Sequence, residues 1–180
     1  PVQKVAQEPE ELFENLDDTP PLEDTESVTA KASGDRVMIR FPSDRFLFET
    51  GMSHIGIKET RNYIRDLGQY LSRNEATWER ANVVGHTDRR GPKGREREVN
   101  QELSNARAAT VKNALVSAGV SSDKLQSEGR AFDEPVAGAL DNESGWRKNR
   151  RVELTFEGGN APEDLISEIN RLNRQYGFGN

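Results

Sequence analysis

The sequence predicts an α/β (α+β) sandwich, with a mixed sheet, helices on one face, the order β-α-β-α-β-β and an extra C-terminal helix. Three observations support this prediction. Apolar residues alternate in short segments near residues 36, 80 and 151, the period of a half-buried strand. Two long segments between them carry apolar residues at helical spacing. Hydrophobic residues make up 33% and charged residues 31% of the chain, which is typical of a globular domain with some unfolded length.

The first half of the predicted domain contains two strands, an apolar hook and a helix. Alternating apolar residues over 36–41 predict a strand that Pro42 ends. Segment 46–51 then predicts an apolar hook that closes on a glycine turn. Over 54–72 apolar residues recur on one side with charges opposite, which predicts a helix, and 80–84 predicts the second strand.

The second half begins with a loop over 89–99 that is rich in glycine, proline and arginine. A helix is expected over 103–118, where it meets Gly119, and a short strand over 125–129. A loop containing a proline then leads to the last strand, 151–156. The domain therefore has room for one sheet and two crossover helices.

A further helix is expected after residue 159. Pro162 suits its first turn, because a proline lacks the N–H that would go unused there. Its apolar stripe must cover either the parent domain or a partner, and we favour the parent domain. The stripe consists of Leu165, Ile169, Leu172 and Tyr176.

Charge and the predicted elements together divide the chain into three parts. Residues 1–34 hold nine acids and two lysines, giving −7, and few large apolar residues, so we interpret them as an acidic linker. A short helix over 10–16 is the alternative there. Residues 35–158 form the predicted domain, and 159–180 form the helical extension. The 146 residues after the linker carry +1, which gives little support for a nucleic-acid-binding surface.

The composition also limits the chemistry. The chain has no cysteine and two histidines, so disulfides, thiol catalysis and a multi-histidine metal centre are not expected. We expect no cofactor and no enzymatic activity, because no nucleophile, second histidine or carboxylate pair accompanies His86. No apolar run approaches a membrane span of about 20 residues. We expect any targeting or membrane segment to lie outside this sequence.

Asp88 and Arg107 are the candidate binding pair. Asp88 follows the strand 80–84, and Arg107 lies about one turn into the predicted second helix, whose start Asn100 and Ser104 could cap. A carboxylate beside a guanidinium suits a zwitterion, because the former accepts from an ammonium and the latter binds a carboxylate bidentately. Asp88 and Arg107 could instead form a structural ion pair with each other, and spacing alone favours such a pair over a ligand site.

Three motifs occur in order along the chain: GHTD at 85–88, NxxLSxxRA at 100–108 and NRRV at 149–152. Over about 35–157 the sequence resembles the OmpA-like C-terminal domain family through these motifs. The resemblance implies non-covalent peptidoglycan binding through the diaminopimelate of the stem peptide. On the family's pattern the ligand-binding residues are Asp88, Arg107, Asn100, Thr87 and Arg150.

The loop length narrows the resemblance. Arg107 follows Asp88 by nineteen positions, more than in porin-type members, which resembles the flagellar stator B subunit (MotB-type) and the type VI secretion anchors. Gly51 departs from relatives that carry a hydrogen-bonding side chain in the hook. The resemblance implies a periplasmic domain tethered to the inner membrane, or to the outer membrane as a protein or lipoprotein. It further implies a homodimer and a membrane-complex partner subunit.

Four alternatives remain beside this interpretation. A wall hydrolase would need a catalytic constellation, and a pure scaffold would use the C-terminal helix as its interface. The basic loop 89–99 could contact anionic polymers, lipid or nucleic acid, but it lacks aromatic residues for base stacking, so we favour a solvated loop. His86 could take part in acid–base or metal chemistry, and we favour a structural hydrogen bond for it.

Overall fold

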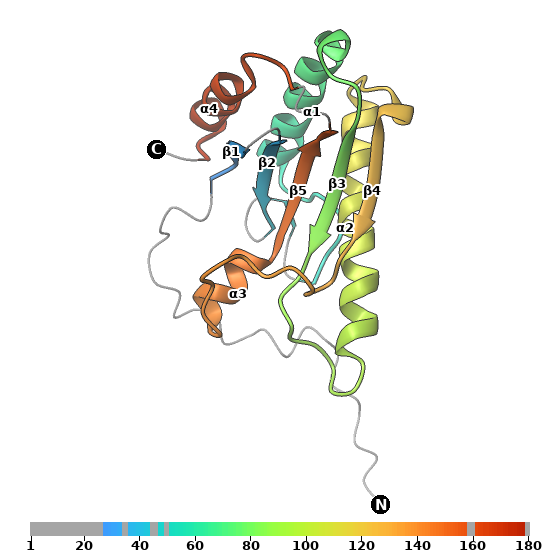
Figure 1. The fold of residues 1–180 in the computed structure, drawn as a ribbon, viewed down its shortest axis with the longest axis vertical. Helices are drawn as coiled ribbons and strands as arrows, with labels where there is room; N and C mark the ends of the chain where they lie inside the picture. The colour runs from blue at the N-terminus through green and yellow to red at the C-terminus, as the bar shows by residue number, and fades with distance from the viewer. Residues whose placement is uncertain (1–26, 34–35, 44–46, 49–50, 158–160, 179–180) are drawn as a thin grey trace, which may run out of the picture.

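The computed structural model describes residues 27–33, 36–43, 47–48, 51–157 and 161–178. Within these residues the chain forms a five-stranded mixed sheet and four α-helices (Figure 1). In chain order the elements are β1 (Thr29–Ser33), β2 (Arg36–Pro42), α1 (Lys58–Arg73), the 3-10 turn Glu75–Thr77, β3 (Ala81–His86), α2 (Glu96–Ser117), the 3-10 turn Ser122–Lys124, β4 (Leu125–Gly129), α3 (Glu143–Asn149), β5 (Arg151–Phe156) and α4 (Leu165–Tyr176).

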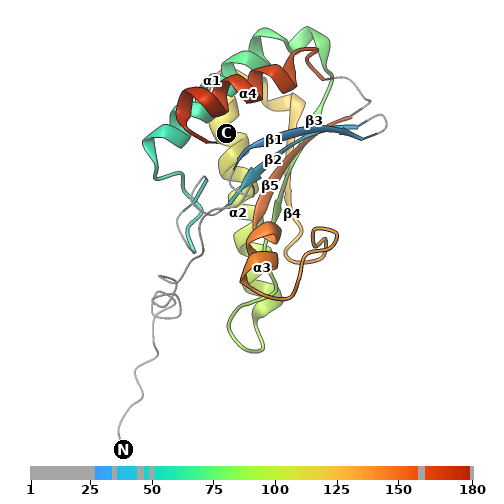
Figure 2. The same cartoon turned by 90° about the vertical axis from the view of Figure 1, so that its left-hand side faces the viewer.

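The strand order is β1-β2-β5-β3-β4. Only the β3–β4 pair is parallel, and α2 makes the crossover between these two strands. Helices α1, α2 and α4 lie together on one side of the sheet, whereas segment 130–142 lies on the other side and α3 beyond the sheet's end (Figure 2). The predicted fold class, a mixed sheet with its main helices on one face, is confirmed.

The helix-facing side of the sheet forms the apolar core. Ile39, Leu154 and Val83 stand opposite one another on β2, β5 and β3, and all three are fully buried. Trp78 closes one end of this layer, with its ring edge-on to Phe156 at 5.5 Å. Period-two alternation in the strands thus places one apolar row against the helices.

Helix α4 packs on the parent domain, against α1 and β1. Leu165, Ile169 and Leu172 of its stripe are buried. Asn173 connects three elements, because it accepts a hydrogen bond from the Tyr63 hydroxyl (3.0 Å) and donates one to the Val28 carbonyl (2.8 Å). The apolar stripe is therefore covered within the chain, which leaves little of it for the scaffold interface considered above.

Strand β1 corrects the predicted boundary of the linker. It lies within 1–34, and it pairs antiparallel with β2 from Thr29↔Arg40 to Ser33↔Arg36. Its sequence, TAKAS, has no large apolar residue, so alternation could not reveal it, and pairing with β2 supplies the order instead. The ordered domain thus begins before residue 29. The helix considered over 10–16 lies outside the described residues.

Two helical predictions were also wrong in detail. Helix α2 begins at Glu96, seven residues before the predicted start, so Asn100 and Ser104 lie inside it and cap nothing, and Arg107 sits about three turns in. Glu96 and Glu98 favour this earlier start because they complement the helix's positive end. Helix α3 replaces part of the predicted loop, and Asn142 caps it by accepting from the Gly145 amide at 3.0 Å.

Among the described helices, none combines the length and the apolar character needed to cross a lipid bilayer.

Candidate functional site

Two glycines let α2 approach the sheet at the carboxyl ends of β3 and β4. A Cβ on Gly85 would lie 2.2 Å from the Ser104 carbonyl oxygen, and one on Gly129 would lie 2.3 Å from the Asn105 amide nitrogen. Any side chain at either position would force the helix away. The segment that follows Gly85 and the middle of α2 are thereby held against each other.

Asp88 emerges from β3 into this region and is 6% exposed. Its Oδ1 accepts from the Arg90 amide (2.8 Å) and Arg90 Nε (3.0 Å), and its Oδ2 accepts from Arg90 Nη2 (3.0 Å) and Arg150 Nη1 (2.6 Å). Burial by itself would raise the pKa of Asp88, but the hydrogen bonds from Arg90 and Arg150 outweigh it and lower the pKa below its ordinary value. Asp88 is therefore an ionised, buried acceptor.

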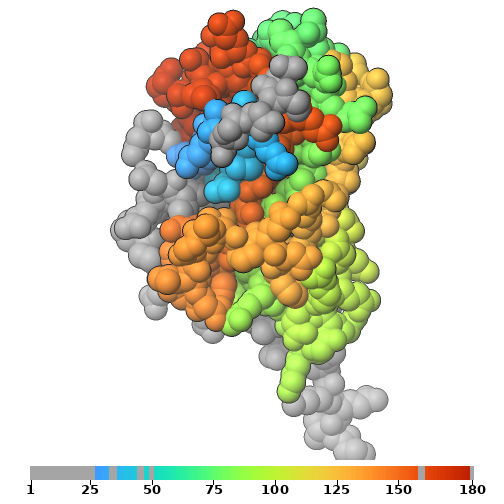
Figure 3. Space-filling model, viewed as in Figure 1, coloured from blue at the N-terminus to red at the C-terminus, as the bar shows by residue number. Residues whose placement is uncertain are grey.

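Helix α3 holds the two arginines that reach Asp88. Glu143 accepts from Arg150 Nη2 at 2.6 Å and lies 3.2 Å from Arg90 Nη1. The Arg90 guanidinium also stacks over the Trp146 ring, 4.4 Å from its centroid. In Figure 3 the segment around α3, in orange, lies across the lower end of the sheet beside the green loop that follows Asp88. A short helix that the sequence did not reveal thus forms one wall of the site.

Arg107 reaches the site from α2 and is 2% exposed. Its Nε donates to the Met52 carbonyl at 3.0 Å, and its guanidinium lies 5.1 Å from the centroid of the buried Phe48 ring. Residues 46, 49 and 50 of the predicted hook lie outside the described residues, while Gly51 has the positive φ of 72° expected of a glycine turn. The hook therefore orients Arg107.

The other three predicted residues hold the loop around Asp88. Asn100 donates from Nδ2 to the Arg90 carbonyl at 2.7 Å, and Arg150 bonds Asp88 directly. The Thr87 amide donates to the Ala131 carbonyl at 2.8 Å, while the buried Thr87 hydroxyl has no hydrogen-bond partner within the described residues. The structure gives Asp88 its ion pairs with Arg90 and Arg150, rather than the Asp88–Arg107 pair weighed from spacing.

Sequence reasoning missed Arg90, Glu143 and Trp146. Only Arg90 left a usable signal, because an aspartate commonly accepts from the amide two residues later in a turn. Glu143 and Trp146 reach the site through α3, whose seven residues carry no periodic pattern. Ala131 is a further surprise, since its φ of 43° is unusual for a residue with a Cβ. Its carbonyl holds Thr87 in place.

The basic loop pairs much of its own charge. Arg89 pairs with Asp141 and Arg97 with Asp133, and Arg95 bonds Glu98 at 3.0 Å. Their positive charge is balanced locally, which weakens the case for a general anion-binding surface.

A second carboxylate with little exposure, Glu153, lies on the open face of the sheet, and its side chain is 13% exposed. It accepts from Arg151 Nε (2.6 Å) and Arg40 Nε (3.2 Å), and its Oε2 lies 3.5 Å from Nε2 of the buried His86. Burial would raise the pKa of Glu153, but the neighbouring His86 ring and the charge and hydrogen bond of Arg151 hold that pKa well below its ordinary value. His86 thus belongs to a structural cluster.

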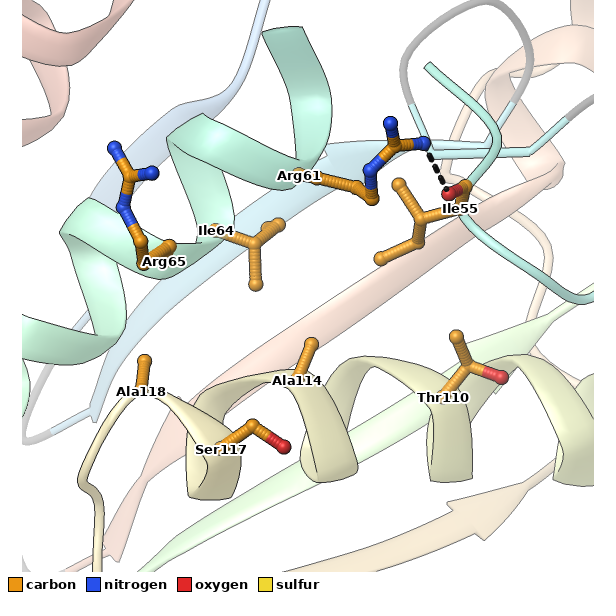
Figure 4. Close-up of a pocket in the computed structure, with 8 residues that line it drawn as sticks. All are labelled: Ile55, Arg61, Ile64, Arg65, Thr110, Ala114, Ser117 and Ala118. Atoms are coloured by element: carbon orange, nitrogen blue, oxygen red, sulfur yellow. Dashed lines mark hydrogen bonds between the residues drawn. The ribbon is translucent and has the colours of Figure 1, made fainter. Parts of the chain in front are cut away.

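A hollow of about 320 Å³ opens between α1 and α2 (Figure 4). Its walls are mainly apolar, with two arginines at the rim and no acidic residue among the lining side chains, so it offers no carboxylate to pair with an ammonium group. The lining residues are Ile55, Arg61, Ile64, Arg65, Thr110, Ala114, Ser117 and Ala118. The polar cluster at Asp88 is therefore the better candidate site for a zwitterion.

The model of the OmpA family matches residues 47–151, more than half of the chain. The protein belongs to the OmpA family. The matched range contains Asp88, Arg107 and Arg150, together with the Phe48 that contacts Arg107.

Curated relatives of this OmpA-family chain come from the bacterial envelope. The chain is 37% identical over 115 residues to outer membrane protein Omp38 of Acinetobacter baumannii. The aligned residues cover 63% of this chain and 30% of Omp38. It is 35% identical over 118 residues to the peptidoglycan-associated lipoprotein of Mesorhizobium japonicum, covering 66% of each. The chain thus spans less than a third of the first relative's length and about two thirds of the second's.

Solved structures share the fold. The cell wall anchor of the T6SS from Pseudomonas aeruginosa superimposes with a TM-score of 0.60 at 27% identity, covering 72% of this chain and 86% of that one. The periplasmic domain of Helicobacter pylori MotB (residues 78–256) gives a TM-score of 0.60 at 22% identity, covering 81% and 90%. At that lower identity the second likeness shows the fold alone.

Proposed function

We propose that this chain binds peptidoglycan non-covalently in the periplasm, by holding the zwitterionic centre of diaminopimelate between Asp88 and Arg107. Asp88 would accept from the ammonium and Arg107 would bind the carboxylate. The observation that carries the proposal is a buried, ionised Asp88 beside a buried Thr87 hydroxyl that lacks a described partner, both within the matched OmpA range. Buried polar groups without partners are rare in native proteins, and a bound molecule is one explanation for them.

The remaining predicted residues have supporting roles in this proposal. Arg150 fixes one oxygen of Asp88, and Asn100 fixes the loop after Asp88 through the Arg90 carbonyl. The names of two relatives, a peptidoglycan-associated lipoprotein and a cell wall anchor, agree with a wall-binding role. No step of the proposal needs a metal, a cofactor or catalysis.

The energetics suit an anchor that many copies share. A hydrogen bond to a charged group contributes about 1.5–3 kcal/mol, so two or three give weak affinity for one stem peptide. Peptidoglycan repeats its ligand, and a homodimer or larger assembly would engage several stems together, which multiplies the effective affinity. Because each single contact is weak, one domain can release its stem peptide and bind another while the other copies stay attached.

Co-sedimentation with purified sacculi tests the proposal. The wild-type chain should sediment with sacculi, whereas Asp88→Ala and Arg107→Ala should remain in the supernatant. Asp123→Ala is the matched control, because Asp123 is exposed near the start of β4, at the opposite end of the sheet. Retention of both site variants, with circular dichroism showing them folded, would refute the assignment. Release of soluble muropeptides would indicate a hydrolase instead.

Within this function we propose a flagellar stator B-type subunit, tethered to the inner membrane and paired with a membrane-complex partner. The long spacing between Asp88 and Arg107 and the fold shared with MotB support it. A wall anchor of a type VI secretion system is the second candidate, favoured by the 27% identity to such an anchor. Deleting the gene distinguishes them, since loss of motility identifies the stator and loss of contact-dependent secretion the secretion anchor. An outer-membrane protein or lipoprotein would show neither loss.

A further inference from the structure

The described residues place four donors on the Asp88 carboxylate: the Arg90 amide, Arg90 Nε, Arg90 Nη2 and Arg150 Nη1. An ionised carboxylate has about four acceptor positions. All of them are therefore occupied, and the side chain of Asp88 is only 7% exposed. A ligand ammonium can reach Asp88 only by displacing one of these donors.

The four donors differ in how easily they can leave. The Arg90 amide belongs to the backbone of a turn that Asn100 fastens to α2. The Arg150 side chain is 12% exposed and also bonds Glu143 at 2.6 Å, so moving it would break two ion pairs. The Arg90 side chain is 35% exposed. It is thus the donor with the easiest route away from Asp88.

The Arg90 guanidinium has two further partners while it bonds Asp88. Glu143 lies 3.2 Å from Arg90 Nη1, and the Trp146 ring lies 4.4 Å from its central carbon. Trp146 is itself fixed, because its Nε1 donates to Asp141 at 2.9 Å. Arg90 can therefore leave Asp88 and keep both a carboxylate and an aromatic face, so its departure costs little charge compensation.

We propose that Arg90 is a built-in competitor that occupies the ammonium position of the site, and that it gives up Asp88 while keeping Glu143 and Trp146 when ligand binds. The inference rests on the proposed function, because it concerns the same carboxylate. The exchange replaces one cation on Asp88 by another, so the buried charge stays compensated. A neutral group could not make this exchange without leaving Asp88 underpaired. Arg90 thus lowers affinity and restricts the site to ligands that carry a cation.

Titration calorimetry of the full chain with free meso-diaminopimelate tests the competitor. Arg90→Ala should bind about tenfold more tightly than the wild type, the change that corresponds to 1.4 kcal/mol. Truncation to alanine could disturb the loop. Arg90→Met keeps an unbranched apolar side chain that can lie on Trp146, so it should give the same gain in affinity without that disturbance. Arg89→Ala is the matched control. It removes one positive charge at the neighbouring position, where the Arg89 side chain is 66% exposed.

The outcomes separate this inference from the proposed function. Tighter binding in both Arg90 variants, unchanged binding in Arg89→Ala and loss in Asp88→Ala support the competitor. If Arg90→Ala and Arg90→Met bind as the wild type does or more weakly while Asp88→Ala still abolishes binding, the competitor is refuted and the proposed site stands. If neither wild type nor any variant binds diaminopimelate or sacculi, both fail.

Discussion

Asp88, which is buried, and Glu153, whose side chain is 13% exposed, are two carboxylates in similar surroundings that are held differently. Each meets two arginines, and the pKa of each lies below its ordinary value. The partners of Glu153 stand on strands, with Arg40 directly opposite it and Arg151 two residues along β5. Asp88 takes most of its hydrogen bonds from a single loop residue, Arg90, whose side chain is one-third exposed.

The difference shows how one fold can hold a permanent ion cluster and an exchangeable one. Partners fixed by strand register cannot leave without breaking the sheet, so the Glu153 cluster is structural. A partner on a loop beside water can leave and return, so the Asp88 cluster can serve a ligand. Burial and pKa alone would not have separated them; the element that carries the partner does.

The largest expected effect is on stability. Glu153→Gln should lower the free energy of unfolding by about 3–5 kcal/mol, because it leaves Arg151 buried without its charged partner. Asp88→Asn should cost about 1–3 kcal/mol, because Arg90 can turn to water or Glu143. Urea unfolding followed by tryptophan fluorescence measures both. Equal losses would end the distinction between a permanent and an exchangeable cluster.

The second effect is on acid sensitivity. Both lowered pKa values mean that each carboxylate stabilises the fold fully above its unfolded pKa, near 4, and that this contribution is lost as pH falls through the folded pKa. The loss should be shallower in Glu153→Gln than in Asp88→Asn, since the pKa of Glu153 is lowered further. Unfolding free energies between pH 2.5 and 7 give the slopes. A Glu153→Gln slope parallel to that of the wild type would contradict the prediction.

The smallest effect concerns Arg90 itself. Arg90→Ala should cost less than about 1 kcal/mol of stability, because its side chain is partly exposed and solvent screens the pair. Arg151→Ala should cost several times more, since Arg151 is 5% exposed and also donates to two backbone carbonyls. Urea unfolding at low and high salt compares them. A loss for Arg90→Ala as large as that for Arg151→Ala would make Arg90 a structural residue.

The sequence predicted the strongly periodic parts of the fold, together with the short strand β4 (Leu125–Gly129), which has no periodic apolar face. Strands β2, β3 and β5 were found because one of their faces is apolar. Strand β1 was missed because a short edge strand of small and polar residues has no such face. The first turns of α2 were missed because residues 96–98 are all charged and none of them is buried, so no apolar pattern marks them as helical.

The candidate site was predictable as a set of residues and not as an arrangement. The motifs named Asp88 and Arg107, but the contacts that decide how Asp88 is held come from Arg90 and from α3, nearly sixty residues apart in sequence. Such long-range pairing depends on how a loop and a seven-residue helix settle on the sheet. Periodicity carries no information about either.

The position of Asn173 has a mechanical consequence. Among the described strands, β1 lies at the edge of the sheet and pairs with β2 alone. Suppose that a force pulls on the chain before β1 while a bound ligand holds Asp88. The force would reach the domain at Val28, whose carbonyl accepts a hydrogen bond from the Asn173 side chain. Helix α4 would then help to hold β1 in place under load. In single-molecule pulling experiments on a chain that lacks α4, β1 should be the first element to detach.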